Sequence, residues 1–316
     1  MTTPPLTTPP IASAPVASPP LALPFFKAQA VGNDFLFSWA DQLPAPWADA
    51  ARREFEPRPV KIPAASADHL CDAARALCHR HEGVGADGWY LMQAEPEADL
   101  GIRLFNSDGS RAELSGNGTR CAAAVFLSEG RAPRTPGQVS VKTGSGVKQV
   151  RLIAAKGNEF LFEMEMGSPR LAQEDIVMSL PLASGLRDVT ILNVGNPQCA
   201  VAVADFDFDW KAVGAEIEGH PYFPKRTNVS FYRKAGPRAI EARFYERGAG
   251  PTLSSGTGST GAAAAAVLRR MVEPELDVIT EAGVMKLRWD HPPSGPLFLE
   301  GPASVTARGE YYGRKG

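Results

Sequence analysis

One short loop occurs twice in this chain and limits the fold more than any other feature. Its copies are Ser115-Gly116-Asn117-Gly118-Thr119 and Ser255-Gly256-Thr257-Gly258-Ser259, and each runs into an alanine-rich apolar stretch. We expect helices over 121–127 and 261–270. A glycine loop before a helix presents free N–H groups and the positive end of the helix dipole. One copy would be an ordinary turn, but the repetition predicts a duplicated architecture in which two facing loops grip one anionic group.

Length, charge and cysteine pattern favour a globular protein with a small-molecule partner. The 316 residues suffice for two domains, each with its own core. The 33 basic and 35 acidic residues indicate neither a nucleic-acid nor a membrane partner. No run approaches the roughly 18 apolar residues that span a bilayer. The four cysteines lack CxxC or framework spacing, which is typical of reduced thiols, and we expect a cytoplasmic location.

The chain divides into a tail and two halves. Residues 1–24 hold eight prolines and no charge, and we interpret them as a disordered or polyproline tail and not as a signal peptide. Beyond the tail, strand-like runs, glycine-rich turns and a few helices alternate, which indicates an α+β protein. Residues 68–79 have helical spacing, whereas 44–67 resemble an irregular insertion. We predict an N-terminal lobe over 25–160, joined by 303–316, and a C-terminal lobe over 161–302.

Polar residues in turn-like contexts are candidates for ligand binding. Asn33, Asn106, Asn196 and Asn228 each lie in such a context, where an asparagine usually caps its own backbone. The segment Glu246-Arg247-Gly248 adds two charged side chains to this set. Arg247 offers a planar fork for a carboxylate, Glu246 a countercharge for an ammonium, and the amides serve either group. Such a set suits a zwitterion.

Cofactor motifs are missing from the sequence. The five histidines offer no third ligand at a metal-like spacing, so we predict no metal site. The glycines of 83–88 lack the lysine and hydroxyl residue of a phosphate-binding loop, and no GxGxxG opens a βαβ unit. We therefore expect no nucleotide cofactor.

Eight motifs in order make the chain resemble the diaminopimelate epimerase family over residues 25 to about 309. They are Ala30-Val31-Gly32-Asn33-Asp34-Phe35, Gly83-Val84-Gly85-Ala86-Asp87-Gly88, Phe105-Asn106-Ser107-Asp108-Gly109-Ser110, Gly116-Asn117-Gly118-Thr119-Arg120-Cys121, Gly195-Asn196-Pro197, Arg226-Thr227-Asn228-Val229, Tyr245-Glu246-Arg247-Gly248 and Gly256-Thr257-Gly258. The resemblance implies an α+β fold of two pseudo-symmetric lobes, each a sheet wrapped around a central helix, with the substrate in the cleft between them.

The resemblance also implies an activity and roles for matched residues. The family interconverts LL- and meso-diaminopimelate without pyridoxal phosphate or metal. By position, the substrate's amino and carboxylate groups would be held by Asn33, Asn106, Asn196, Asn228, Glu246 and Arg247. The backbones of Gly116, Asn117, Gly256 and Thr257 would hold the carboxylate of the reacting carbon. The sequence leaves open whether the chain forms a homodimer.

The catalytic positions depart from the family pattern. A cysteine precedes each glycine loop in the family, one removing the α-proton and the other delivering a proton, whereas this chain has Ser115 and Ser255. Cys121 cannot substitute, because it lies about 7 to 9 Å further along a helix. The pKa of a hydroxyl is on the order of five units higher than that of an activated thiol. Forming the ionised base therefore costs roughly 7 kcal/mol more free energy for serine than for cysteine. Gln198 and Pro251 also replace a usual histidine and glutamate.

Three interpretations of the double serine stay open. Both cysteines were replaced deliberately to trap a substrate complex, the natural protein epimerises slowly or with another base, or it performs a different task on a related ligand. That task is a racemase-type, isomerase or dehydratase reaction on another small carboxylate, or binding without catalysis. Epimerisation of diaminopimelate, with Ser115 and Ser255 at the acid/base positions, remains the leading hypothesis because the substrate-holding set is intact by position.

Overall fold

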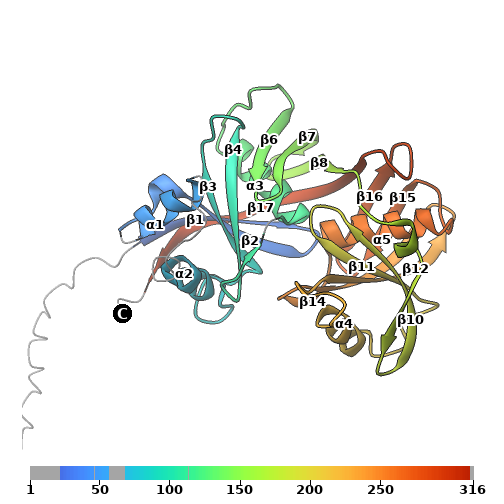
Figure 1. The fold of residues 1–316 in the computed structure, drawn as a ribbon. Coiled ribbons are helices and arrows are strands. Elements are labelled where there is room, and N and C mark those ends of the chain that lie inside the picture. The colour runs from blue at the N-terminus through green and yellow to red at the C-terminus, as the bar shows by residue number, and fades with distance from the viewer. Residues whose placement is uncertain (1–21, 46, 57–67, 113, 314–316) are drawn as a thin grey trace, which may run out of the picture.

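The computed structural model describes residues 22–45, 47–56, 68–112 and 114–313, which form two lobes side by side (Figure 1). The tail predicted over 1–24 lies outside the described residues as far as residue 21. Its last three residues, from Ala22 to Pro24, instead begin strand β1 (Ala22–Ala30). No helix within the described ranges is both long and apolar enough to span a membrane.

The N-terminal lobe combines a sheet with three α-helices. After β1 come β2 (Asn33–Trp39), a short 3-10 helix (Ala40–Gln42), α1 (Trp47–Phe55), α2 (Asp68–Cys78), β3 (Gly88–Gln93), β4 (Leu100–Asn106), β5 (Arg111–Ala112), α3 (Gly116–Ser128), β6 (Gln138–Thr143), β7 (Gly146–Lys156) and β8 (Glu159–Gly167).

The C-terminal lobe repeats this vocabulary. It contains a 3-10 turn (Gln173–Asp175), β9 (Met178–Leu182), β10 (Gly185–Asn193), β11 (Pro197–Ala202), α4 (Trp210–Glu218), β12 (Asn228–Gly236), β13 (Ala239–Glu246), β14 (Gly250–Thr252), α5 (Gly256–Leu268), β15 (Glu275–Thr280) and β16 (Gly283–Trp289). The last strand, β17 (Leu297–Tyr312), belongs to both lobes.

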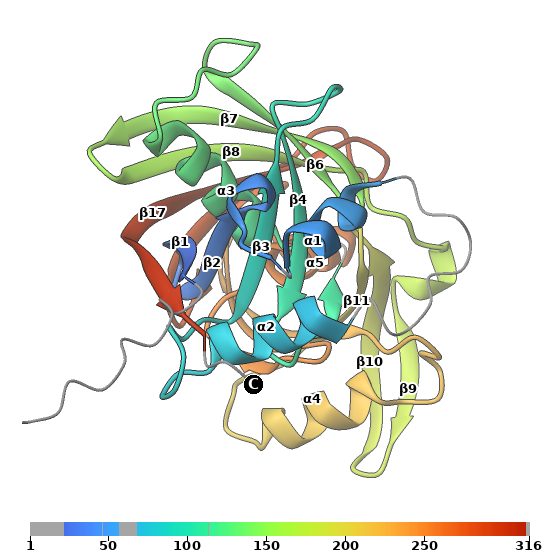
Figure 2. The same cartoon turned by 90° about the vertical axis from the view of Figure 1, so that its left-hand side faces the viewer.

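Strand pairing repeats between the lobes, which confirms the predicted duplication. In the first lobe β2 and β3 are parallel across α2, β3 and β4 are antiparallel, and β4 and β6 are parallel across α3. In the second lobe β11 and β12 are parallel across α4, β12 and β13 are antiparallel, and β13 and β15 are parallel across α5. The lobes therefore share a crossover helix outside the sheet, α2 or α4, and a helix at the centre, α3 or α5 (Figures 1 and 2).

The central helices are α3 and α5, and both are buried on all sides near their starts. Every residue from Gly116 to Phe126 and from Gly256 to Ala266 is buried. Runs of alanine let the strands approach closely from all directions, because a small side chain needs little space. The outer helices α2 and α4 cover the opposite faces through separate apolar clusters.

One strand joins the two lobes. The first residues of β17 pair with β16, its last residues pair with β1, and its first half also pairs with β8. Because the sheet continues through this strand, the lobe limits predicted above (25–160 with 303–316, and 161–302) stay a prediction.

Two sequence-based expectations need correction. Within the predicted irregular insertion 44–67, residues Trp47–Phe55 form α1, since the Pro44 carbonyl accepts from the N–H groups of Trp47 and Ala48 and the helix buries Ala50 and Ala51. Residues 57–67 lie outside the described residues. The two glycine motifs are not loops before helices but the first turns of α3 and α5, which begin at Gly116 and Gly256.

Candidate active site

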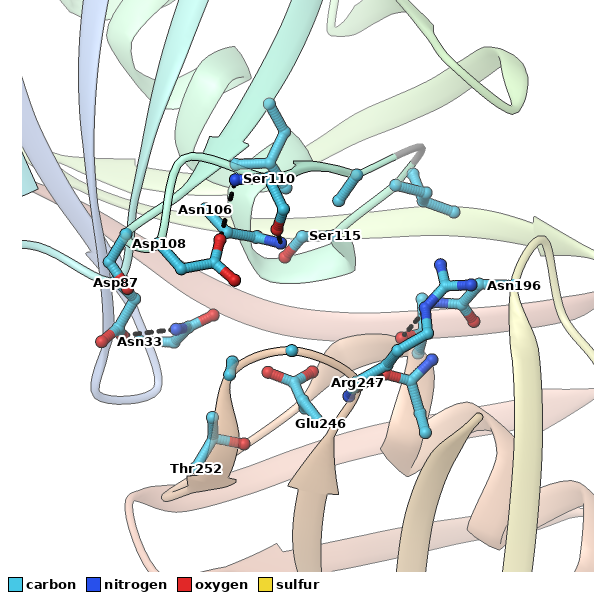
Figure 3. Close-up of a pocket in the computed structure, with 18 of the residues that line it drawn as sticks. Asn33, Asp87, Asn106, Asp108, Ser110, Ser115, Asn196, Glu246, Arg247 and Thr252 are labelled. Carbon is cyan, nitrogen blue, oxygen red and sulfur yellow. Dashed lines mark hydrogen bonds between the residues drawn. The ribbon is translucent and has the colours of Figure 1, made fainter. Parts of the chain in front are cut away.

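A pocket of about 400 Å³ lies between the lobes where α3 and α5 begin. Figure 3 shows Asn33, Asn106 and Ser115 on one side of it and Glu246, Arg247 and Thr252 on the other. Its wall carries eight of the twelve site residues predicted from the sequence, which are Asn33, Asn106, Ser115, Asn196, Asn228, Glu246, Arg247 and Thr257. The remaining four, Gly116, Asn117, Ser255 and Gly256, are buried behind this wall.

The first turns of the two central helices meet at the pocket. A Cβ on Gly256 would lie 3.0 Å from the Gly116 Cα and 3.1 Å from the Asn117 nitrogen, and one on Gly116 would lie 3.2 Å from the Gly256 Cα. Any larger residue would push the helices apart. Two helix N-termini, each with free N–H groups and a partial positive charge, therefore converge on one place, which favours a bound anion.

Ser115 and Ser255 are the N-caps of these helices. The Ser115 Oγ accepts from the Gly118 N–H at 3.2 Å, and the Ser255 Oγ accepts from the Gly258 N–H at 3.0 Å. Serine is among the best N-cap residues, since its oxygen satisfies an N–H group that the helix leaves unpaired. Both hydroxyls are thereby fixed where a helix N-terminus stabilises negative charge.

Ser255 is paired with a carboxylate. Its hydroxyl donates to Glu246 Oε1 at 2.5 Å, and Glu246 itself reaches the pocket wall. Burial and the nearby negative charge of Asp87 raise the pKa of Glu246 to about 7, against the opposing hydrogen bond from Ser255. A carboxyl group that titrates near neutrality both accepts and donates a proton under physiological conditions.

Ser115 has a different environment. The buried Tyr90 hydroxyl lies against Gly118, so closely that a Cβ on this glycine would come within 2.0 Å of it. Burial raises the pKa of Tyr90 far above its usual range, and the neighbouring Ser115 hydroxyl lowers it only in part. Within the described residues, no acidic side chain bonds to Ser115. The two helix N-termini therefore differ: the Ser255 hydroxyl has a carboxylate partner, and the Ser115 hydroxyl has none among the described residues.

Three of the four asparagines bond across the fold, whereas Asn106 bonds within its own turn. Asn33 donates to Asp87 Oδ2 at 2.5 Å, and Asn196 donates to Thr257 Oγ1 at 3.2 Å. Asn228 accepts from the Arg247 N–H at 3.0 Å and donates to the Pro197 carbonyl. Asn106 donates to Ser110 at 3.0 Å. These bonds fix each amide at the pocket wall, and a local turn contact describes Asn106 but not the other three.

The departures from the family pattern have structural consequences. Gln198 is buried and donates to Asn196 Oδ1 at 2.7 Å, which sets the orientation of that amide. Pro251 lies in the pocket wall on β14. Burial raises the pKa of Cys121 to about 12 and that of Cys199 still further, so neither thiol takes the place of a missing catalytic cysteine.

Sequence reasoning assigned no role to several residues of this site. Asp87 lines the pocket, and burial together with the neighbouring Asp34 carboxylate raises its pKa. Asp108 lines it as well and caps the Ser110 N–H at 2.8 Å. Both lie inside quoted motifs, at 83–88 and 105–110, so an acidic residue within a glycine-rich motif was the available signal. Tyr90 lies on a strand, and no feature of the sequence marked it as a residue of the site.

Arg247 lies on the C-terminal lobe's side of the pocket, and we predict that it binds a carboxylate of the ligand. It follows β13 directly, lines the pocket, and its Nη1 donates to the Lys225 carbonyl at 3.3 Å. We expect Arg247→Met to reduce ligand affinity at least tenfold without loss of fold, because a carboxylate loses a charged fork. Calorimetry with diaminopimelate measures this, with the exposed Arg238→Met as control. Unchanged affinity would make Arg247 a structural residue.

Comparisons with known proteins agree with this geometry. The chain matches the family model described as diaminopimelate epimerase over residues 60–172 and 190–306. It is 34% identical to a diaminopimelate epimerase of Pelotomaculum thermopropionicum, covering 91% of this chain and 98% of that protein. A second one, from Synechococcus sp. strain JA-3-3Ab, is 36% identical with coverages of 89% and 95%.

A solved structure shares the fold at low identity. The hydroxyproline epimerase from Agrobacterium vitis, with bound trans-4-hydroxy-L-proline, has a TM-score of 0.63 and 15% identity, covering 92% of this chain and 91% of that one. The fold, the two helices that begin at the glycine motifs and the sequence matches are all consistent with one family. The chain belongs to the diaminopimelate epimerase family.

Proposed function

We propose that this protein is a cofactor-independent amino-acid isomerase that acts on the α-carbon of diaminopimelate, in the supply of lysine and peptidoglycan precursors. The observation that carries the proposal is the meeting of two serine-capped helix N-termini at a pocket whose wall holds Glu246. The relatives' activity supports a cytoplasmic location, and a homodimer is compatible with it.

Chemistry at such a site starts from the carboxylate on the reacting carbon. Held by the N–H groups of the first turns of α3 and α5, this carboxylate takes up the negative charge that develops when the α-proton leaves. Glu246, directly or through the Ser255 hydroxyl, accepts the proton on the α5 side. Return of a proton from the same side restores the starting stereoisomer, whereas donation of a proton by the Ser115 hydroxyl on the other side inverts it, after which Ser115 regains a proton from solvent and Glu246 releases one to it.

The unequal serines support a second candidate. Of the two cap serines, Ser255 bonds to an acidic side chain and Ser115 bonds to none among the described residues, so one face of the carbon has a competent base and the other a hydroxyl without one. A racemase-related isomerase or dehydratase needs one such group. The same asymmetry predicts for epimerisation that proton removal is faster from one stereoisomer than from the other.

Incubation with LL-diaminopimelate in deuterated water tests the proposal. Deuterium at the α-carbon of both LL and meso product means epimerisation. Deuterium without inversion means that one face works, and it favours the single-base isomerase. The absence of exchange despite binding overturns the enzymatic proposal and leaves a ligand-binding homologue. Mass spectrometry and chiral separation of the recovered amino acid give both measurements.

A further inference from the structure

A buried arginine lies behind the helix N-termini. Arg120, in the second turn of α3, has no exposed surface, and it is the one basic side chain that is fully buried in the described part of the chain. Gly301 on β17 makes room for it, because a Cβ there would lie 3.1 Å from Arg120 Nη2. The fold therefore encloses this guanidinium in a slot of matching size.

No carboxylate pairs with Arg120 in the part of the chain that the structure describes. Its contacts among the described residues are the Gly116 carbonyl at 3.4 Å, Asn117 Oδ1 at 2.7 Å and the Met285 sulfur at 3.8 Å, and its Nε has no partner. Burial lowers the pKa of the guanidinium to about 10, so it stays charged at neutral pH. An enclosed charge without a counter-ion destabilises a protein, and its retention calls for a compensating interaction.

The contacts of Arg120 lead to the place where the helices meet. Arg120 Nη1 donates to the carbonyl of the Gly116–Asn117 peptide, and the nitrogen of the same peptide is the one that lies 3.1 Å from a Cβ position on Gly256. A hydrogen bond to the carbonyl polarises the peptide and makes its N–H a stronger donor. The guanidinium also holds the Asn117 amide, whose Nδ2 bonds Ser254 at 3.2 Å.

We propose that Arg120 is a positioning residue whose buried charge is balanced by the ligand's carboxylate, bound between the N-termini of α3 and α5. The arginine acts through the Gly116–Asn117 peptide and the Asn117 side chain, without touching the ligand. This inference rests on the proposed function for the identity of the ligand, but not for its charge: a bound carboxylate is the required counter-ion.

A purely structural arginine would behave differently. Its removal would destabilise the free protein and leave carboxylate affinity unchanged in whatever folded. A charge balanced only by the ligand has the opposite signature, since its replacement by an apolar side chain of similar length leaves the ligand-free protein as stable or more stable. The two readouts, stability without ligand and affinity for ligand, therefore separate the two roles.

The experiment compares the full chain with Arg120→Met, Arg120→Gln and Arg120→Lys. Glutamine keeps a donor toward Asn117 without the charge, and lysine keeps the charge. Arg233→Met is the matched control, because Arg233 pairs with Glu241 on β13 and does not line the pocket. Calorimetry gives the Kd for LL-diaminopimelate, and the melting temperature in rising acetate concentration reports binding of a minimal carboxylate.

We expect the methionine and glutamine variants to bind about tenfold or more weakly, the order expected from loss of one partly screened unit charge, and the lysine variant and the control to stay near the parent. Without ligand the methionine variant should melt no lower than the parent. Parental affinity in the two neutral variants, or failure of both to fold, overturns the inference.

The failure of the proposed function is separable. If the parent binds acetate but no diaminopimelate, that function is wrong, and the acetate affinities of the same variants decide the role of Arg120. If the parent binds neither carboxylate, both proposals are overturned.

Discussion

Replacing Glu246 by glutamine is expected to slow α-proton exchange from diaminopimelate by about 10² to 10⁴-fold, the contribution typical of a positioned general base. Glutamine has nearly the same shape and still accepts the Ser255 hydrogen bond, but it takes up no proton. Ligand affinity should change far less than the exchange rate. Deuterium incorporation under single-turnover conditions, with Kd from calorimetry, separates the two effects.

A matched control is available on the same strand. Glu241 lies on β13, pairs with Arg233 and Arg243, and does not line the pocket. Glu241→Gln should therefore leave exchange near the parental rate. If Glu246→Gln exchanges as fast as Glu241→Gln, the base is another group and the Ser255–Glu246 pair is structural.

The pH dependence of exchange follows from the raised pKa of Glu246. Only the ionised carboxylate removes a proton, so the rate should rise with pH and level off above about 7, where the folded-state pKa lies. The glutamine variant should lose this inflection. A parental profile that is flat between pH 5 and 8 would contradict the assignment of Glu246 as the base.

The same shift has a defined effect on stability. Because burial raises the folded-state pKa of Glu246 from 4.5 to about 7, the folded protein holds more protons than the unfolded chain between these values. The free energy of unfolding therefore falls as pH rises through this window, and the loss is complete above about 7. Its upper limit is about 3 kcal/mol, reduced by the partial exposure of Glu246 to the pocket.

The architecture could be predicted because the same pattern of strands and a glycine-motif helix occurs twice in the sequence. The alternation of strand-like runs and glycine-rich turns in the sequence corresponds to strands of both lobes, such as β2, β3, β12 and β13. The starts of α3 and α5 were placed too late, since glycine has low helix propensity. There the serine caps and the close contact of Gly116 with Gly256 outweigh propensity. Propensity alone carries no information about such a long-range contact.

Helix α1 was missed for a related reason. Residues 44–67 are rich in proline, alanine and charge, which is typical of irregular segments, but burial of Ala50 and Ala51 against the outer cluster of the lobe stabilises one helical stretch. Tertiary packing outweighs local composition in this case.

The residues of the site were easier to predict than the hydrogen bonds between them. The sequence motifs indicated Ser255 and Glu246 separately, but their hydrogen bond depends on how the chain returns through β14 between β13 and α5. Arg120 stood in a quoted motif without a role, because a charged residue in a helix is usually exposed and only the structure shows its burial. Pairings and burial depend on both lobes at once, and a single sequence does not record them.

Restoring thiols at both helix N-termini is expected to increase epimerase turnover at least about 10²-fold, the lower end of the contribution of positioned acid–base groups. The double variant Ser115→Cys and Ser255→Cys places a thiol at each N-terminus, where the helix dipole and its N–H groups favour the thiolate. The new thiol at position 255 also lies beside Glu246, which can take up its proton. Each variant loses a serine cap, at a cost of about 1 kcal/mol per helix.

The single variants locate the deficit. Each should recover little turnover, because inversion needs a competent group on both faces of the α-carbon. Ser115→Cys adds a thiol to the face where the serine has no acidic partner among the described residues. It should therefore recover more inversion than Ser255→Cys. α-Proton exchange and stereochemical inversion of LL-diaminopimelate, measured on the parent, both single variants and the double variant, make the comparison. A double variant that binds the substrate but stays as slow as the parent would mean that the pocket is shaped for a different reaction, and the single-base isomerase or the ligand-binding homologue would then replace the epimerase.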